Sequence, residues 1–458
     1  MQDCSLDTIE SVVTEQRSYF KSDVTKDLAF RTESLKRFKA AILRYESKIT
    51  DALWLDLHKS PEEAYLTEIS IVLQELNDHL RHLSKWAKPK SVATPLQLLP
   101  SSSRIHFEPL GTTLIIAPWN YPFQLLLNPL VGAISSGCCA LLKPSPYTPN
   151  IARVMEELVA ETFDPGHVVL VQGGRVVNQL LLEQRFDLIF FTGSPSLGKL
   201  VMQAAAKYLT PVVLELGGKS PCIVDEGADI KVAARRIAWG KCINAGQTCI
   251  APDYLFVHKR VREQLMKEIP IAIEEMYGKE IKSSNYFPRI VNDQAVERLQ
   301  KLMKHGKIVW GGEVDVADRF IAPTIIEDIQ PDFPIMQEEI FGPILPVMTF
   351  ESLDMVTDYI NENEKPLAFY YFGPTSVARK LLIKTSSGGG CINDTLIHIA
   401  NHHLPFGGVG NSGMNNYHGK FSFQAFSHAR GIVSSVTWID LPFRYAPFKF
   451  FQWVKKII

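Results

Sequence analysis

Between residues 112 and 216 the chain alternates short apolar runs with stretches of helical periodicity. The apolar runs that have the length of buried strands are 112–117, 138–143, 167–172, 187–191 and 211–216. Such an alternation predicts a parallel sheet with helices on both faces. Ligands of this kind of sheet bind at the carboxyl ends of its strands, so residues that follow the apolar runs are the first candidates for a functional site.

Flanking segments complete a predicted α/β fold. Apolar positions recur at helical spacing over 28–53, and a second helix is predicted over 61–86, where Pro61 suits the first turn. Residues 91–110 are rich in Ser, Pro and Thr, and their composition suits a linker or an exposed arm. A second alternating block over 217–395 predicts a second α/β domain. Within it we expect helices at 228–242 and 260–276 and strands at 254–258 and 344–350.

Composition narrows the class of protein. A chain of 458 residues has the length of about two to three domains, and its formal net charge of -1 gives no indication of nucleic-acid binding. The seven cysteines include no CxxC pair and no Cys/His spacing for zinc, so no metal site is predicted and a reducing compartment is the simplest reading. Residues 1–10 lack a basic-then-apolar signal pattern, and no apolar run is long enough to span a bilayer. We therefore expect a soluble cytoplasmic protein.

Cys249 lies in the run Asn244–Pro252, where small and polar residues separate two more apolar segments. A loop cysteine needs no function, and this stretch alone favours that interpretation. A nucleophilic cysteine needs open access, together with backbone amides or a positive field that favour the thiolate. Gly246, Thr248 and Ala251 leave the space that a nucleophile requires.

Two other polar residues stand at predicted strand ends. Glu215 lies at the end of one apolar run, before a glycine turn, and Asn120 follows another. A partly desolvated glutamate has a raised pKa that suits proton transfer near neutrality, and an asparagine amide can donate to an oxyanion. With Cys249, these groups suit covalent chemistry at a carbonyl carbon.

Several separated motifs, in the right order, resemble those of the aldehyde dehydrogenase superfamily. They extend over most of the chain: 114–122, 191–194, 214–221, 244–252, 338–343 and 405–413. Segments 56–69 and 417–420 resemble its class 3, fatty-aldehyde-type branch. The resemblance implies oxidation of medium- or long-chain aliphatic, or aromatic, aldehydes to carboxylates by a homodimer that uses NAD or NADP.

The resemblance also implies domain boundaries. A Rossmann-like NAD(P)-binding domain would comprise residues 1–84 and 106–216, and a second α/β catalytic domain would comprise 217–411. A small β arm for bridging and oligomerisation would comprise 85–105 and 427–440. Because Glu215 and Cys249 then lie on either side of the domain junction, we expect the active site in the cleft between the domains.

The expected phosphate site does not depend on the usual dinucleotide fingerprint, since no GxGxxG follows a predicted strand. The sequence of the turn Gly193–Leu200 matches the P-loop motif except at its last position, where Leu200 replaces the Ser or Thr that would ligate magnesium. A pyrophosphate still fits there, because free N–H groups point out of a helix N-terminus. In the resembled family this turn faces the NAD(P) pyrophosphate, with Ser194 as the side-chain contact. The cofactor-binding residues implied for this region are Gly193, Ser194, Gly198 and Leu216.

The resemblance assigns three further cofactor contacts. Lys143 corresponds to a lysine that, with a glutamate three positions later, holds the adenosine ribose, but this chain has Pro146 in place of the glutamate. A carboxylate there would accept from the 2′-hydroxyl and repel a 2′-phosphate, so its absence leaves both NAD and NADP open. Glu339 resembles the group that holds the nicotinamide ribose, and Phe341 resembles the ring beside the nicotinamide. Whether Glu339 also accepts a proton is left open.

The implied reaction has two stages. Cys249 attacks the aldehyde, Asn120 and the Cys249 N–H stabilise the oxyanion, and loss of hydride from the hemithioacetal gives a thioester. Glu215 then activates water to hydrolyse that thioester. The alternatives are an acylating, coenzyme A-dependent dehydrogenase, which retention of Glu215 disfavours, a cysteine hydrolase or acyltransferase that uses no cofactor, and a catalytically silent protein.

Three further features are the C-terminal tail, a group of histidines and one asparagine. Residues 441–458 form an aromatic and basic tail, for which two prolines favour docking over an apolar groove rather than contact with a membrane surface. His398, His402 and His403 are expected to be exposed loop residues without a tie to Cys249. Asn415 stands where class 3 relatives often have glycine, and the sequence alone gives no reason for it.

Overall fold

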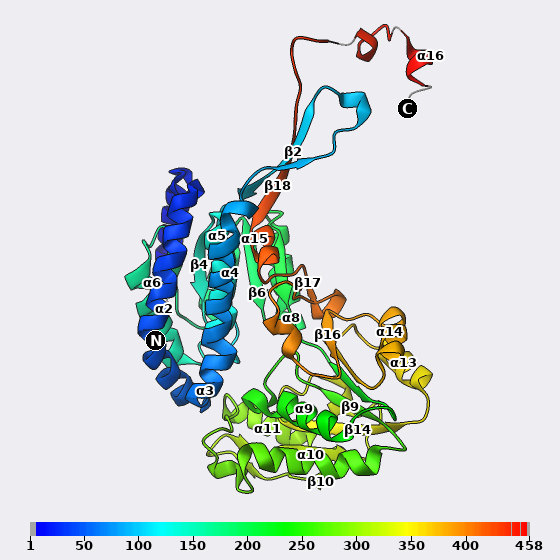
Figure 1. The fold of residues 1–458 in the computed structure, drawn as a ribbon. Coiled ribbons are helices and arrows are strands. Elements are labelled where there is room, and N and C mark those ends of the chain that lie inside the picture. Colours follow the sequence, from blue (N-terminus) through cyan, green and yellow to red (C-terminus); the bar gives the residue numbers. More distant parts are fainter. Residues whose placement is uncertain (1–5, 441, 449, 456–458) are drawn as a thin grey trace.

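The computed structural model describes residues 6–440, 442–448 and 450–455, which form two sheet-based units and a projecting arm (Figure 1). The first sheet has six strands in the order β17-β7-β6-β3-β4-β5. Its strands are β3 (Thr112–Ile116), β4 (Cys139–Lys143), β5 (Val168–Leu170), β6 (Leu188–Thr192), β7 (Val212–Glu215) and β17 (Gly413–Met414). The five strands from β3 to β7 run parallel, as predicted, whereas β17 returns from late in the chain and pairs antiparallel with β7.

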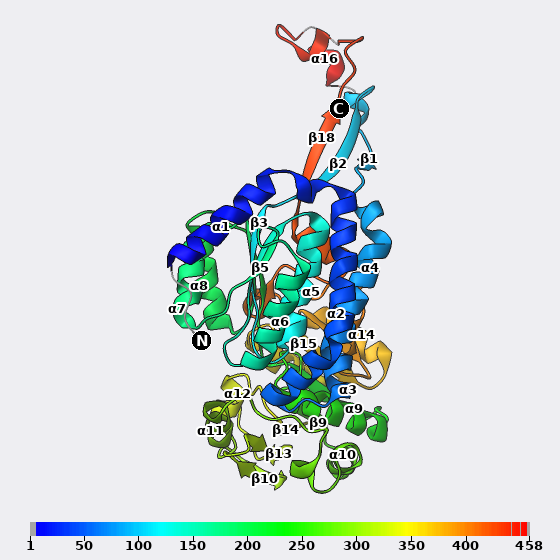
Figure 2. The ribbon, with the colours of Figure 1, turned by 90° about the vertical axis from the view of Figure 1, so that its left-hand side faces the viewer.

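Helices cover both faces of this sheet (Figure 2). Successive side chains of a strand point to opposite faces, so Ile115 packs in one core and its neighbours Leu114 and Ile116 pack in a second. Helices that contribute to the larger core are α2 (Leu28–Leu57), α4 (Ser70–Trp86), α5 (Pro122–Ser136) and α6 (Pro149–Thr162). Those that contribute to the smaller core are α1 (Leu6–Lys21), α7 (Arg175–Glu183) and α8 (Pro195–Ala206).

The helix predicted over 61–86 is not uniform. It starts as α3 (Pro61–Ala64), passes through one π-helical segment, η2 (Tyr65–Ile69), and continues as α4. Ser60 caps α3 by accepting from the Glu63 N–H at 3.1 Å. A π-helical segment changes which side chains face inward, and such segments are frequent at functional sites.

The second sheet has seven strands in the order β10-β13-β14-β9-β8-β15-β16, all parallel except β10 against β13. Its strands are β8 (Pro221–Val224), β9 (Tyr254–His258), β10 (Lys307–Trp310), β13 (Thr324–Glu327), β14 (Ile344–Phe350), β15 (Ala368–Phe372) and β16 (Gly389–Ile392). The helices of this unit are α9 (Ile230–Cys242), α10 (Arg262–Tyr277), α11 (Asp293–Leu302), α12 (Pro334–Gln337), α13 (Leu353–Glu362) and α14 (Thr375–Lys384). A small ribbon, β11 (Val314–Asp315) with β12 (Phe320–Ile321), completes the unit.

A three-stranded antiparallel sheet projects from the first unit (Figures 1 and 2). It consists of β1 (Lys90–Val92), β2 (Ser102–Pro109) and β18 (Ser427–Ser434), the last of which follows α15 (Lys420–Ala425). Of the two interpretations that composition allows for 91–110, a linker or an exposed arm, the structure has the exposed arm, which contains β1 and β2. The described part of the tail includes α16 (Phe451–Val454), whereas residues 441, 449 and 456–458 lie outside the described residues. Among the residues that are described, no helix is long and apolar enough to cross a membrane.

Candidate active site

The strand order brings the candidate residues to one edge. In the sheet the strands lie side by side in the order β5-β4-β3-β6-β7. From β3 the chain adds β4 and β5 on one side and then β6 and β7 on the other, so the switch point lies between β3 and β6. Ligands of doubly wound sheets bind at such a switch point. Asn120 follows β3, and Glu215 is the last residue of β7. Cys249 comes from the second unit, after α9 and the turn η4 (Ile243–Gly246). The sequence expectation of a site between two α/β units agrees with this arrangement.

The turn before Cys249 is held in an unusual backbone conformation. Asn244, Ala245 and Gly246 all have positive φ, at 51°, 51° and 72°. The Gln247 side chain donates to the Asn244 carbonyl at 3.0 Å and accepts from the Val291 N–H at 2.9 Å. These bonds fix a strained turn, which is the kind of backbone that clusters at active sites.

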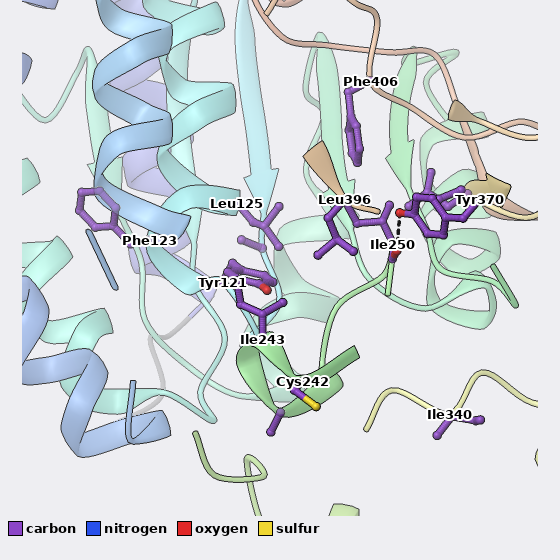
Figure 3. Packing of buried hydrophobic residues seen from close by; sticks show 14 of the residues in the cluster. Tyr121, Phe123, Leu125, Cys242, Ile243, Ile250, Ile340, Tyr370, Leu396 and Phe406 are labelled. Carbon is purple, nitrogen blue, oxygen red and sulfur yellow. Dashed lines mark hydrogen bonds between the residues drawn. The ribbon is translucent and has the colours of Figure 1, made fainter. Parts of the chain in front are cut away.

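The far side of the nucleophile loop is also fixed. The Tyr370 hydroxyl donates to the Ile250 carbonyl at 2.6 Å, as Figure 3 shows. On the near side, the Tyr121 hydroxyl lies 2.7 Å from Thr248 Oγ1. Cys249 is therefore flanked by two residues whose positions are set by buried tyrosines.

The Cys249 thiol is half-buried and surrounded by acidic groups. Burial raises its pKa, and the nearby carboxyl groups of Glu339 and Glu215 raise it further, while the backbone N–H groups of Cys249 and Ile250 lower it. Backbone amides that favour a thiolate are thus present, but the charged groups that act on the sulfur are acidic. The site therefore favours the thiol form of Cys249, which needs a base before it can attack.

Glu215 is buried, and neither of its carboxyl oxygens has a hydrogen-bond partner among the residues that the structure describes. Burial raises its pKa well above the usual range of a glutamate. A buried carboxyl group left without such a partner is typical of a site that takes up water or substrate. Glu215 is close enough to Cys249 for its charge to raise the pKa of the thiol.

Asn120 lies beside the same loop. Its Nδ2 donates to the Gln247 carbonyl at 3.0 Å, and its Oδ1 is buried without a partner. An asparagine amide carries two N–H donors, so one remains for a ligand. The carbonyl of Asn120 itself accepts from Lys59 and from Asn244, each at 2.9 Å. The sequence did not indicate this support, because Lys59 is distant along the chain.

The residues expected at the phosphate end of a cofactor gather at the β6–α8 turn. Ser194 is exposed and caps α8 by accepting from the Leu197 N–H at 3.4 Å. A Cβ on Gly198 would lie 2.8 Å from the Leu216 side chain, so these two residues are in close contact. A twelve-residue helix with an accessible N-terminus at the switch point, reached through Gly193, is chemically suited to a pyrophosphate.

The other residues of the expected cofactor site are Lys143, Glu339 and Phe341. Lys143 is buried at the end of β4 and donates to the Pro144 carbonyl at 2.7 Å. The Glu339 carboxyl group accepts from the Gly218 N–H, and burial raises its pKa to about 8. The Phe341 ring meets Trp119 edge-on at 5.4 Å between centroids. Lys143 stands at the end of β4 and Glu339 lies near Cys249, and side chains of these kinds are chemically suited to the two ends of an extended dinucleotide.

A cavity of about 530 Å³ adjoins the nucleophile loop. Thr248 and Ile250, on either side of Cys249, form part of its wall. The rest of the lining comprises three tyrosines, five polar residues and nine apolar residues, which are Leu66, Ile71, Trp239, Ile243, Met276, Leu396, Ile397, Ile399 and Ala400. Periodicity alone could not distinguish these residues from core positions, so the sequence did not identify them.

The interpretation of the loop histidines as exposed was wrong for His398 and His402, both of which are partly buried. Its Nδ1 lies 3.4 Å from Cys391 Sγ, its Nε2 is buried, and burial lowers its pKa to about 4. His402 is half-buried and lies 3.5 Å from the Asp78 carboxylate, while His403 is exposed. His398 is therefore a packed residue beside the cavity wall rather than an exposed one.

Asn415 now has a physical explanation. Its φ is 66°, in the left-handed region where glycine and asparagine are favoured. Its Nδ2 donates to the Val212 carbonyl at 2.6 Å. Asparagine therefore provides the same turn as glycine and adds a bond to β7.

A doubly wound sheet with a free helix N-terminus at its switch point defines the class of dinucleotide-binding α/β enzymes. The chain belongs to the aldehyde dehydrogenase family, because the model of the Aldehyde dehydrogenase family matches residues 1–432. It is thus an NAD(P)-dependent oxidoreductase that oxidises aldehydes.

Individual relatives agree with this assignment. The chain is 47% identical over 447 residues to a 4,4'-diaponeurosporen-aldehyde dehydrogenase of Staphylococcus aureus, covering 97% of each chain. It is 42% identical to a dimeric NADP-preferring aldehyde dehydrogenase of Canis lupus familiaris, covering 93% and 94%. A solved structure titled as the substrate bound state of Staphylococcus aureus AldH superposes with a TM-score of 0.96 at 46% identity, covering 98% of this chain and 99% of that one. The resemblance to the class 3 branch is confirmed.

Proposed function

We propose that this protein oxidises medium- and long-chain apolar aldehydes to carboxylates, with Cys249 as the nucleophile. The observation that carries the proposal is the apolar cavity of about 530 Å³ that ends at Thr248 and Ile250. Small-molecule pockets are mostly apolar with a few polar groups that fix orientation, and the polar lining here includes Thr248, next to Cys249. An aldehyde with a long hydrocarbon chain would bury that chain in the cavity and present its carbonyl carbon to Sγ.

In the first stage the thiol of Cys249 loses its proton and attacks the carbonyl carbon. Glu215 and Glu339 are the two carboxyl groups near the sulfur that can accept that proton in their ionised form. Burial raises the pKa of Glu339 to about 8 and that of Glu215 well above its usual range, which makes each carboxylate a stronger base. The second N–H of the Asn120 amide and the Cys249 backbone N–H donate to the developing oxyanion, an interaction worth roughly 3 to 4 kcal/mol per donor.

NAD(P), when bound, would supply the hydride acceptor, and loss of hydride from the carbon attached to Cys249 would leave a thioester on the sulfur. The residues that would hold it are Lys143 at the adenosine ribose, Ser194 and the α8 N-terminus at the pyrophosphate, and Glu339 with Phe341 at the nicotinamide end. Gly193, Gly198 and Leu216 shape the turn at the pyrophosphate.

In the second stage Glu215 takes a proton from water, which attacks the thioester and releases the carboxylate product. Its two unpartnered oxygens support this role, because each can accept from a water molecule. A relative that passes the acyl group to coenzyme A would not need this base. Hydrolysis therefore fits the site better than transfer to a thiol acceptor.

The assembly and location are also proposals. The exposed arm β1-β2-β18, which overlaps the predicted segments 85–105 and 427–440 and continues to Pro109, supports a homodimer, and one relative is named as dimeric. The domains are assigned as predicted: cofactor binding to 1–84 and 106–216, catalysis to 217–411. The described cysteines, six in number, are all unpaired, which suits a cytoplasmic, reducing setting.

The test is a series of initial rates with butanal, octanal, dodecanal and benzaldehyde, using NAD and NADP in turn. We expect kcat/KM to rise with chain length, because each methylene that enters the cavity contributes about 0.8 kcal/mol. A kcat/KM that is flat or falls from butanal to dodecanal would contradict the proposed substrate class. Turnover without either cofactor would contradict the proposed chemistry.

A further inference from the structure

A buried lysine lies beneath the peptide of Asn120. Lys59 and Glu68 both have fully buried side chains, with 0% exposure, and form an ion pair at 2.5 Å. A buried ion pair stabilises a protein only if its remaining hydrogen-bonding groups are also satisfied. Here Lys59 Nζ also donates to the Asn120 carbonyl at 2.9 Å and lies 4.1 Å from the centroid of the Tyr121 ring. Three partners are thus present for the three N–H groups of the ammonium.

Glu68 connects the same pair to the start of α5. Its second oxygen accepts from the N–H groups of Phe123 and Gln124, at 2.8 and 3.2 Å. The residue before the helix, Tyr121, supplies no side-chain cap of its own. Glu68 lies in the π-helical segment η2, and its carboxylate therefore caps the N-terminus of α5 in place of a residue next to that helix.

The backbone of Asn120 is held from two directions at once. Its carbonyl accepts from Lys59 on one side and from Asn244 Nδ2, in the nucleophile turn, on the other. Its side-chain amide reaches the carbonyl of Gln247, two residues before Cys249. A shift of the Asn120 peptide would move the Asn120 side-chain amide relative to the Cys249 sulfur, because these hydrogen bonds join Asn120 both to Lys59 and to the nucleophile turn.

We propose that the buried Lys59–Glu68 ion pair is a positioning device that sets the Asn120 amide against Cys249 for oxyanion stabilisation. The inference rests on the proposed function, in which Asn120 donates to the oxyanion. The effect of this buried pair is assigned to the Asn120 carbonyl that Lys59 holds. The contact of Lys59 with the Tyr121 ring is a second link, toward Thr248, and a change through it would alter the alkylation rate of Cys249. Removal of the pair should slow attack on the aldehyde without changing the reactivity of the thiol itself.

The informative variant replaces both charges together. Lys59→Met alone would leave a buried carboxylate without its counter-charge, which is strongly destabilising. In Lys59→Met/Glu68→Gln, methionine fills the space of the lysine stem, and the glutamine oxygen can still cap α5. This variant removes the bond to the Asn120 carbonyl and leaves no orphan charge. Thermal unfolding and cofactor binding establish that the variant is folded before its rates are compared.

The experiment compares four proteins in a cycle: wild type, Lys59→Met/Glu68→Gln, Asn120→Ala and the triple variant. The first readout is the rate of reduced-cofactor formation in the first turnover with octanal. The second is the rate at which iodoacetamide alkylates Cys249 in the absence of aldehyde. The cycle isolates the coupling between the ion pair and Asn120.

We expect the paired variant to lose about 10- to 100-fold in first-turnover rate when Asn120 is present, as for a catalytic group displaced by about 1 Å. In the Asn120→Ala background we expect a further loss of less than about threefold, and alkylation within about twofold in all four proteins. Equal losses in both backgrounds, or an unchanged rate in the paired variant, would overturn the positioning role. If Asn120→Ala alone leaves the first-turnover rate unchanged, the proposed oxyanion role fails as well, so the two failures can be told apart.

Discussion

Gly246 offers a sharp test of how the nucleophile turn is held, through the variant Gly246→Ala. Its φ of 72° places an alanine in the left-handed region, which costs about 1 to 2 kcal/mol. An added Cβ would also collide with the carbonyl group of Gly342 and lie 2.9 Å from the Lys241 carbonyl oxygen. Both are backbone atoms that cannot rotate away. The turn must therefore move, and we expect Cys249, three residues on, to be displaced by up to about 1 Å, which can lower the rate of attack about 100-fold.

Gly278→Ala is a control for backbone strain without a clash, because Gly278 has φ 80° and ψ 171°, a combination that only glycine adopts readily, and nothing lies within 4 Å of an added Cβ. The assay is the first-turnover rate with octanal, together with the midpoint of thermal unfolding. We expect Gly278→Ala to lose on the order of 1 to 3 kcal/mol of stability and to keep its rate, whereas Gly246→Ala loses both stability and most of its rate. A rate for Gly246→Ala within about threefold of wild type would refute the view that this contact positions the cysteine.

Other features give predictions of their own. Pro146→Glu adds an exposed carboxylate near the adenosine ribose site, and we expect kcat/KM with NADP to fall at least about tenfold relative to NAD; an unchanged ratio would contradict the cofactor assignment. Met276→Trp fills part of the cavity, so kcat/KM for dodecanal should fall at least about tenfold while that for butanal stays within about threefold; equal losses would contradict the proposed chain site. Burial alone would raise the pKa of Glu75, but the hydrogen bond and charge of His79 and the charge of His418 hold it at about 2. Because this value lies below the usual 4.5, the stability that Glu75 contributes is present above about pH 4.5 and is lost as the pH falls toward 2. Urea midpoints of Glu75→Gln should therefore depend less on acid than those of the wild type, and parallel curves would show that the carboxylate has no such role.

Much of the first sheet followed from the sequence because its strands are buried on both faces. A strand such as β3 is buried along its whole length and therefore appears in the sequence as one continuous apolar run. The helices between these runs are recognisable by the helical spacing of their apolar residues. The antiparallel strand β17 was not predicted, since two residues carry no periodic signal. The strands of the arm were missed as local structure because their side chains are mostly exposed or half-buried, and pairing with β18 rather than a core determines them.

The candidate residues were recognisable where local chemistry marks them. Glu215 at a strand end and Cys249 after a glycine turn carry such a signal. Lys59 and Glu68 do not, because their partners at Asn120 and the start of α5 are distant in sequence and appear only once the chain is folded. The raised pKa of Cys249 could not be predicted either, since it depends on two carboxyl groups from separate segments.

The central claim is a covalent route through Cys249 that Glu215 completes. The most direct measurement is the intact mass of Glu215→Gln after mixing with NAD(P) and octanal, with Cys249→Ala as the control. The account predicts that Glu215→Gln forms reduced cofactor once, accumulates the octanoyl thioester on Cys249 and turns over at least about 100-fold more slowly than the wild type. It also predicts that Cys249→Ala gains no mass and produces no reduced cofactor. Steady turnover by folded Cys249→Ala, or full activity of Glu215→Gln without an adduct, would contradict the account.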